Sequence, residues 1–263
     1  MRKQGETKRV LTENLHLLDA ELIQICRKMD FPDFSDDGQY LEIHYLGDMT
    51  SVLGSPEDDF NNHFTARLLL ILESYSLFND QTYHDIISTI ANTYFRDYHD
   101  HHREFKPIFL VNDIIRFWKT LCLNYEHKRN RPTNDQRKKL KNHVKNLKLK
   151  FSRLLTCFSM IYALSIRRST ITADELVTLI GKSPLERITS GTKEHSDNAN
   201  LILAEYAWFL ENTGRKQEDV LDWLSIESNR VDAFAHARNF GNNMYDLLQI
   251  ATGESEAFRF LVI

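Results

Sequence analysis

A narrow polar stripe on one predicted helix carries residue types that suit a charged ligand. Residues 109–130 read as an amphipathic helix, with the apolar side chains on one side at about 100° per residue. The members of the stripe lie three or four residues apart: Asp113, Arg116, Thr120, Asn124 and His127, bordered by Asn112 and Lys119. Arginine can bind a phosphate group with two hydrogen bonds, and amides can match the edge of a base. An internal Asp–Arg network between crossing helices explains the same spacing, and spacing alone somewhat favours it.

A second group of polar residues follows on the next predicted helix. Asn146, Lys150 and Arg153 share one face of it, whereas Lys148 points elsewhere. The segment 128–153 holds eleven Lys/Arg residues and one Asp, although the whole chain has a net charge of −4. Such a local excess can attract phosphate-bearing ligands, but charge alone favours the alternative, a solvated lysine-rich loop and helix face. We expect these nucleotide- or phosphate-binding residues: Asn112, Asp113, Arg116, Lys119, Asn124, Asn146, Lys148, Lys150 and Arg153.

The composition limits the fold class and the cellular setting. Only 9 Gly and 5 Pro occur in 263 residues, which favours long helices over a loop-rich β-protein. The 3 cysteines show no CxxC spacing, so we expect a reducing compartment and neither a disulfide framework nor a zinc site. No apolar run approaches the about 18 residues of a membrane span, and no signal peptide is visible at the N-terminus. We therefore expect a cytoplasmic protein without a membrane partner.

A cluster of histidines and aspartates at residues 97–102 raises the question of a metal site. His99, His101 and His102 crowd together at a predicted helix end, and this spacing differs from that of usual zinc ligands. A solvated loop is the favoured interpretation, so we predict no metal there.

The order of predicted elements indicates a mainly α protein, a helical bundle with a small N-terminal β element. The segment YLEIHYL, residues 40–46, reads as a strand because its apolar and β-prone residues partly alternate. Capping boxes beginning at Thr172 and Ser183 predict two helix starts near the C-terminal part. The expected domains are a partial α/β element at 1–60, a central helical domain at 61–170 and a C-terminal helical section at 171–263.

Three segments give this chain a resemblance to a known family. They are VNDIIRFWKTLCLNYEHK at 111–128, NLKLKFSRLLTCFS at 146–159 and HFTARLLLILESYSLF at 63–78. They resemble the helical region that follows the catalytic palm in bacterial predicted nucleotidyltransferases, which are related to protein-PII uridylyltransferases and polymerase-β-like enzymes. The resemblance covers roughly residues 40–160 and implies that the helices hold the nucleotide or its acceptor beside a palm. The predicted β element would then be a remnant of that palm.

The catalytic motif of that family is missing from this sequence. Such enzymes bind nucleotide and Mg²⁺ through a Gly-Ser turn and a following Asp-x-Asp strand, because clustered carboxylates hold the metals that neutralise the triphosphate. Gly54-Ser55 is followed almost at once by Glu57 and Asp58, and no Asp-x-Asp strand is found. Glu42 on the predicted strand could stand only in the place of a third carboxylate. No cofactor is therefore expected, and Mg²⁺ would be needed only if a palm were present.

Several interpretations remain open. The chain can be a fragment or a truncated reading frame of a nucleotidyltransferase, which is favoured, a degenerate relative that binds without catalysis, or a helical fold used elsewhere. The alternative function is a non-catalytic helical module that binds nucleic acid or a partner protein, in regulation, phage defence or a toxin–antitoxin pair. A ribonuclease of the HEPN type would need an Arg and a His at a set spacing on one helix, and no convincing pair stands out.

The missing carboxylates lead to a direct prediction about activity. Residues 1–263 alone should not transfer a nucleotide, because no two-metal site can form from one candidate carboxylate. Incubation of the purified chain with labelled nucleoside triphosphates and Mg²⁺ would check this. Mg²⁺-dependent transfer above the level of a heat-denatured sample would contradict it.

Overall fold

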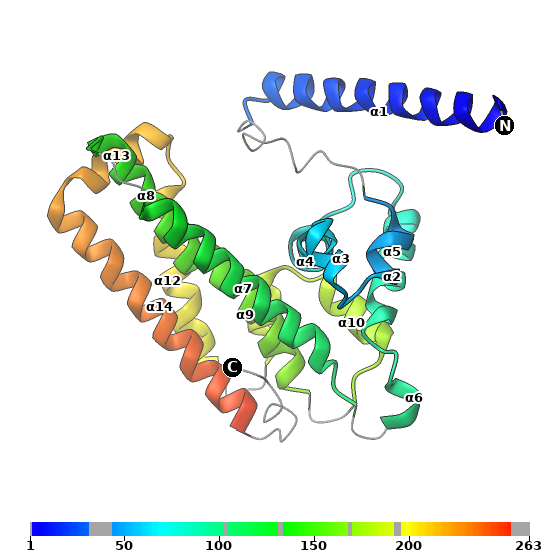
Figure 1. The fold of residues 1–263 in the computed structure, drawn as a ribbon. Helices are drawn as coiled ribbons and strands as arrows, with labels where there is room; N and C mark the ends of the chain where they lie inside the picture. The colour runs from blue at the N-terminus through cyan, green and yellow to red at the C-terminus, as the bar shows by residue number, and fades with distance from the viewer. Residues whose placement is uncertain are drawn as a thin grey trace. The chain divides into compact units, whose positions relative to one another are not determined.

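The computed structural model describes residues 2–31, 44–101, 105–130, 134–167, 170–191 and 196–253, with residues 2–12 and 101 described in their backbone alone. It divides into two compact units, Met1–Tyr45 and Leu46–Ile263. The first unit is described through α1, Arg2–Lys28, a helix of 27 residues. The second unit is a helical bundle (Figure 1). The helical fold class is thus confirmed for the described residues.

The first half of the larger unit forms one hydrophobic core around α4, His63–Glu73. This helix is apolar on nearly every side, and it buries Leu68, Ile71 and Leu72 completely or almost so. Residues of the surrounding helices complete the same core. These helices are α2 (Leu46–Ser51), α5 (Asp80–Thr93), α7 (Ile108–Arg129), α9 (Leu154–Ser165) and α10 (Ala173–Ile180). The short α3 (Pro56–Phe60) packs against α4 and buries Asp58 rather than an apolar side chain. The short α6, Tyr98–His101, follows α5.

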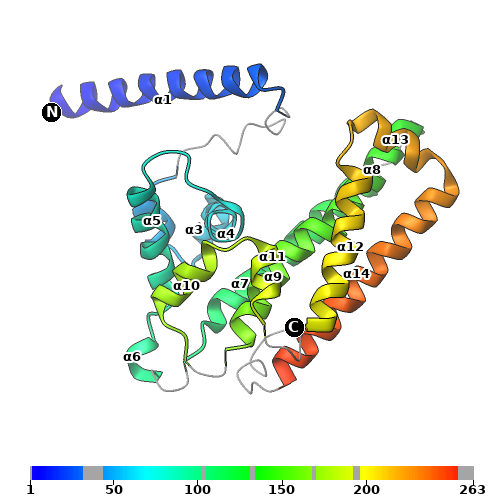
Figure 2. The ribbon, with the colours of Figure 1, turned by 180° about the vertical axis from the view of Figure 1, so that it is seen from behind.

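The second half forms a separate core in which aromatic rings stack. Phe151 is fully buried, and its ring centroid lies 4.6 Å from Phe209 and 4.9 Å from Phe240. α12 packs along α14, as both views show (Figures 1 and 2). The helices of this half are α8 (Gln136–Lys148), η2 (Leu149–Arg153), α11 (Pro184–Thr189), α12 (Ser196–Thr213), α13 (Gln217–Ser225) and α14 (Glu227–Gly253).

A continuous helical segment links the two cores. α8 passes into η2, a π-helical stretch of five residues, and then into α9. Phe151 of η2 belongs to the second core, while Cys157 and Met160 of α9 belong to the first. Phe158 packs against both. Residues 136–165 therefore act as the shared wall of the bundle.

Local sequence signals set the start of two later helices as predicted. The side chains of Thr172 and Ser183 each accept a hydrogen bond from the backbone N–H three residues on, and Glu175 and Glu186 return the bond. The helix predicted over 61–78 is shorter, because α4 ends at Glu73 and Ser74 is extended. The hydroxyl of Ser74 lies 2.8 Å from that of Tyr83, which fixes this chain reversal next to α5.

The predicted β element is not supported. Residues 40–43 lie outside the described residues, His44 and Tyr45 belong to no strand, and Leu46 begins α2. α2 forms instead because Met49 points into the first core and Asp48 lies in the first turn, where a carboxylate complements the helix dipole. No strand occurs in the part of the chain that the structure describes. The domain boundaries expected at residues 60 and 170 stay predictions.

No described helix is long and apolar enough to cross a membrane.

The stacked aromatic core predicts that replacing two different phenylalanines by alanine will change the free energy of unfolding by very different amounts. Phe151→Ala should lower the free energy of unfolding by about 3–5 kcal/mol, since it removes a fully buried ring and leaves a cavity. Phe60→Ala is the matched control, because that ring is 90% exposed and should change stability by less than about 0.5 kcal/mol. Urea denaturation followed by circular dichroism measures both. Equal losses would show that Phe151 is not a core residue.

Candidate functional site

The polar centre of the larger unit is a completely buried arginine. Arg67 lies in the middle of the apolar helix α4 and is 0% exposed. Its Nη1 and Nη2 atoms donate to the two carboxylate oxygens of Asp58 at 2.9 and 2.6 Å. Nη1 also donates to the Met49 carbonyl at 2.9 Å, and Nε donates to the Tyr94 hydroxyl at 3.0 Å. A buried guanidinium needs such partners because its desolvation is costly.

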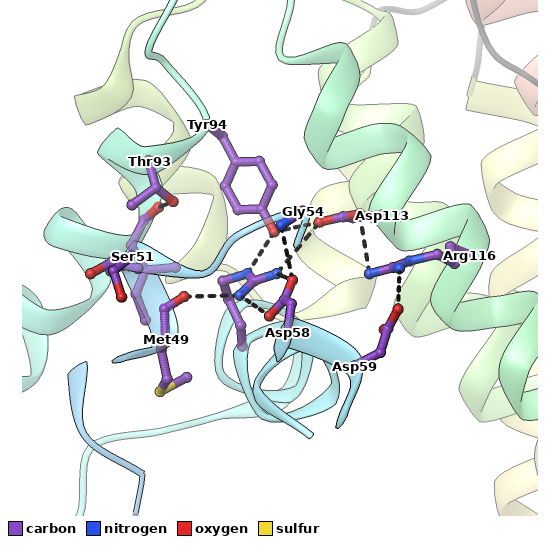
Figure 3. Close-up of polar contacts among 12 residues, drawn as sticks. Met49, Ser51, Gly54, Asp58, Asp59, Thr93, Tyr94, Asp113 and Arg116 are labelled. Carbon is purple, nitrogen blue, oxygen red and sulfur yellow. Dashed lines mark hydrogen bonds and ion pairs between the residues drawn. The ribbon is translucent and has the colours of Figure 1, made fainter. Parts of the chain in front are cut away.

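From Tyr94, a partner of Arg67, a chain of hydrogen bonds and ion pairs runs through Asp113 and Arg116 to the exposed Asp59 (Figure 3). The Tyr94 hydroxyl donates to Asp113 of α7 at 2.9 Å. Asp113 lies 3.8 Å from Arg116 on the same helix, and Arg116 donates to Asp59 at 3.1 Å. The Arg116 guanidinium also sits 3.6 Å from the centre of the Phe64 ring, a cation–π contact. The network thus joins α2, α3, α4, α5 and α7.

Burial and neighbouring charges together shift the pKa values of the residues in this network. Burial would lower the pKa of Arg67, but its hydrogen bonds and the charge of Asp58 raise that pKa overall, so the guanidinium stays charged. Burial, followed by the charge of Asp113, raises the pKa of Tyr94, so the phenol keeps its proton and can donate. Burial also raises the pKa of Asp113 above its ordinary value, although Tyr94 and both arginines act against it.

Two residues predicted for ligand binding are therefore held in an internal network. Asp113 is 22% exposed and Arg116 is 41% exposed, and the contacts just described occupy both side chains. This is the Asp–Arg network between crossing helices that the spacing also allowed. Their role in binding stays a prediction, because Arg116 still presents part of its guanidinium to solvent.

The other predicted residues lie on α7 and on the α8–η2 segment. Lys119 and Asn124 are exposed on α7, where Asn112 is half-buried. Lys148 and Lys150 are exposed, and Asn146 is half-buried, near the π-helical turn. Lys150 comes near Cys122 of α7: burial raises the pKa of this thiol, and the lysine charge acts to lower it. Arg153 forms an ion pair with Glu73 at the end of α4.

The basic segment is an exposed face with few acidic partners. Arg129, Arg137 and Arg153 each pair with a carboxylate, from Glu126, Glu218 and Glu73 respectively. The lysines are all exposed, and no ion pair or hydrogen bond from their side chains occurs among the described residues. They are Lys128, Lys138, Lys139, Lys141, Lys145, Lys148 and Lys150.

The described residues contain no group of His, Cys, Asp or Glu side chains that could hold a metal ion. Glu42, the weak catalytic candidate, lies outside the described residues, as does His102. His99 is exposed on the short helix α6, where a loop was predicted.

Comparison with protein-family models, curated proteins and solved structures finds no match to this chain. The resemblance to nucleotidyltransferase-related helices therefore stays a prediction.

Sequence reasoning missed most of the buried network. Arg67 could be noticed as a charge inside an apolar helix, and this was its one local signal. Nothing in the sequence paired it with Asp58 or Tyr94, because these residues come from separate helices. Sequence reasoning also passed over one Arg and His pair on a single helix, the kind of pair considered above for a HEPN-type ribonuclease. Arg230 and His236 lie on α14 with five residues between them. Arg230 donates to the Leu224 carbonyl, and His236 lies 2.6 Å from Glu205, so both side chains make structural contacts.

Two neighbouring aspartates allow a matched test of this network. Asp58→Asn should lower the free energy of unfolding by about 3–5 kcal/mol, because it removes the buried countercharge closest to Arg67 and leaves only Asp113, 3.8 Å away. Asp59→Asn breaks an exposed pair with Arg116 and should cost less than about 1 kcal/mol. Urea denaturation at pH 7 measures both. A cost for Asp58→Asn no larger than that for Asp59→Asn would contradict the assigned network.

Proposed function

We propose that this chain is the substrate-binding helical part of a nucleotidyltransferase-like protein and has no transfer activity by itself. Its ligand is a nucleotide or another phosphate-bearing molecule, bound on the face formed by α7, α8 and η2. The observation that carries the proposal is the set of exposed lysines on these helices, whose side chains form no ion pair among the described residues. Such lysines leave a positive potential that a phosphate group can neutralise.

The π-helical turn supports the position of this site. A π-helical turn within an α-helical segment is rare, and such turns often occur at functional sites. Here it contains Lys150 and follows Lys148, and it lies between the two cores. Asn146 just before it and Lys119 and Asn124 on α7 could add hydrogen bonds to a base or sugar. Arg153 contributes through its pair with Glu73, which holds the turn against α4.

A second candidate function is nucleic-acid binding by a non-catalytic module. Lys138, Lys141, Lys145 and Lys148 are spaced by three, four and three residues, so they form one exposed line along α8. Ten residues of helix span about 15 Å, which suits several phosphates of one backbone better than a single nucleotide. A protein partner with an acidic surface is the further alternative for the same lysines.

One set of binding measurements separates the two candidates. Lys150→Gln should weaken binding of a nucleoside triphosphate about tenfold or more, because a charge-assisted contact is lost. The same change at Lys148, which faces another side of the helix, should weaken that binding less. Lys138→Gln/Lys141→Gln/Lys145→Gln should leave that affinity nearly unchanged. The control is Lys182→Gln/Arg238→Gln, which removes two positive charges from elsewhere in the same unit. Isothermal titration calorimetry at low salt measures the affinities.

The same variants tested with a single-stranded oligonucleotide address the second candidate. The plot of the logarithm of the binding constant against the logarithm of the salt concentration has a negative slope. Neutralising all four lysines of the α8 line should make this slope shallower by about 3, as expected for four lost phosphate contacts. Binding of the oligonucleotide without the triphosphate would favour the second candidate. If neither the triphosphate nor the oligonucleotide binds, phosphate binding on this face is rejected. The same holds if the control variant Lys182→Gln/Arg238→Gln weakens binding as much as the test variants do.

A further inference from the structure

The helix α1 carries a line of apolar residues that is half open to solvent. Leu15, Leu18, Leu22, Ile25 and Met29 follow one another at spacings of three, four, three and four residues. Leu18 and Ile25 are each 49% exposed and Met29 is 57% exposed, while the side chains of Leu15 and Leu22 are partly exposed. The described residues of the unit Met1–Tyr45 include no second helix that could cover this line.

The spacing identifies the kind of partner. An alternation of three and four residues has an average period of about 3.5, which keeps an apolar line facing another helix in a left-handed coiled coil. In that repeat Leu15, Leu22 and Met29 take the a positions, and Leu18 and Ile25 take the d positions. In the sequence Leu11 extends the pattern by one further d position. A single amphipathic helix in water gains little stability from its own hydrogen bonds, so it needs such a partner.

We propose that α1 pairs with α1 of a second copy of this chain in a parallel, in-register coiled coil. The charges that flank the seam favour this arrangement. The flanking e position holds Asp19, and the flanking g position holds Glu21. Parallel pairing places Asp19 opposite Asn14 and Glu21 opposite Cys26 of the second copy, so no like charges meet. Antiparallel pairing with the same apolar layers would bring Asp19 against Asp19 and Glu21 against Glu21.

The charges beside the apolar line argue against a membrane surface as its occupant, because the Lys and Arg residues of α1 lie only toward its two ends, at 2–9 and 27–28. Residues 13–26 contain Glu13, Asp19 and Glu21 and no Lys or Arg. Helices that lie on anionic membranes carry a Lys/Arg-rich polar face, and this segment has the opposite charge. The seam covers only two to three heptads, so the dimer should form in a concentration-dependent way. This inference concerns a different unit from the proposed ligand face, so either can fail without the other.

Adjacent leucines give a matched pair for the test. Leu17 is 64% exposed but lies outside the seam, at a c position, whereas Leu18 lies in it. Analytical ultracentrifugation of the full chain over a wide concentration range should show wild type and Leu17→Glu reaching twice the chain mass of 30.9 kDa. Leu18→Glu should remain a monomer at concentrations at least tenfold higher. Circular dichroism during thermal unfolding would show whether Leu46–Ile263 stays folded in each variant.

A cross-linking experiment tests the direction of the pair. In a Cys26→Ser background, Leu18→Cys should form an interchain disulfide under a mild oxidant, since d positions of a parallel in-register pair face each other. Leu17→Cys in the same Cys26→Ser background should form much less interchain disulfide, because residue 17 lies outside the seam. A wild-type monomer at every concentration, or equal effects of the Leu17 and Leu18 variants, would overturn the proposal. A dimer without the Leu18→Cys cross-link would overturn the parallel arrangement, and a Leu18→Glu effect on stability alone would mean that α1 packs on its own chain.

Discussion

The larger unit depends on the burial of one positive charge. Arg67 is placed in an apolar helix where no water can solvate it, so the surrounding helices must supply every compensating group. Asp58 supplies the countercharge, and Tyr94 and the Met49 carbonyl supply further acceptors. Each partner comes from a different helix. The buried pair therefore fixes the mutual position of α2, α3, α4 and α5 more specifically than apolar contacts alone would.

The network around Arg67 also includes α7, the helix on which the sequence predicts ligand-binding residues. Tyr94 donates to Asp113, so α7 joins the same network, and Arg116 closes it at the surface through Asp59. A residue held in this way has little freedom to reorganise around a ligand. The lysines of α8 and η2 are different, since they are exposed and their side chains form no ion pair or hydrogen bond among the described residues. The bundle thus separates side chains that hold helices together from side chains available for binding.

The π-helical turn η2 contacts both halves of the larger unit and also carries one of the exposed lysines. Phe151 inserts into the aromatic core, and two residues later Arg153 pairs with Glu73 of α4. One short stretch therefore contacts both halves of the unit while it exposes Lys150. Any ligand bound at this turn would lie against residues that both cores hold in place.

The sequence by itself determined the helical class, the capping boxes at Thr172 and Ser183, and the position of the basic segment. These features are local, because helical periodicity, capping and charge density depend on residues close together in the chain. The tertiary structure decided which partners Asp113 received, and it placed Leu46 in a helix where a strand was expected. Arg67 and Asp58 are nine residues apart, and Tyr94 and Asp113 are nineteen, so no local pattern could pair them. Packing also decided which cations have a carboxylate partner. Arg153 pairs with Glu73 of α4, whereas Lys148 and Lys150 form no ion pair among the described residues.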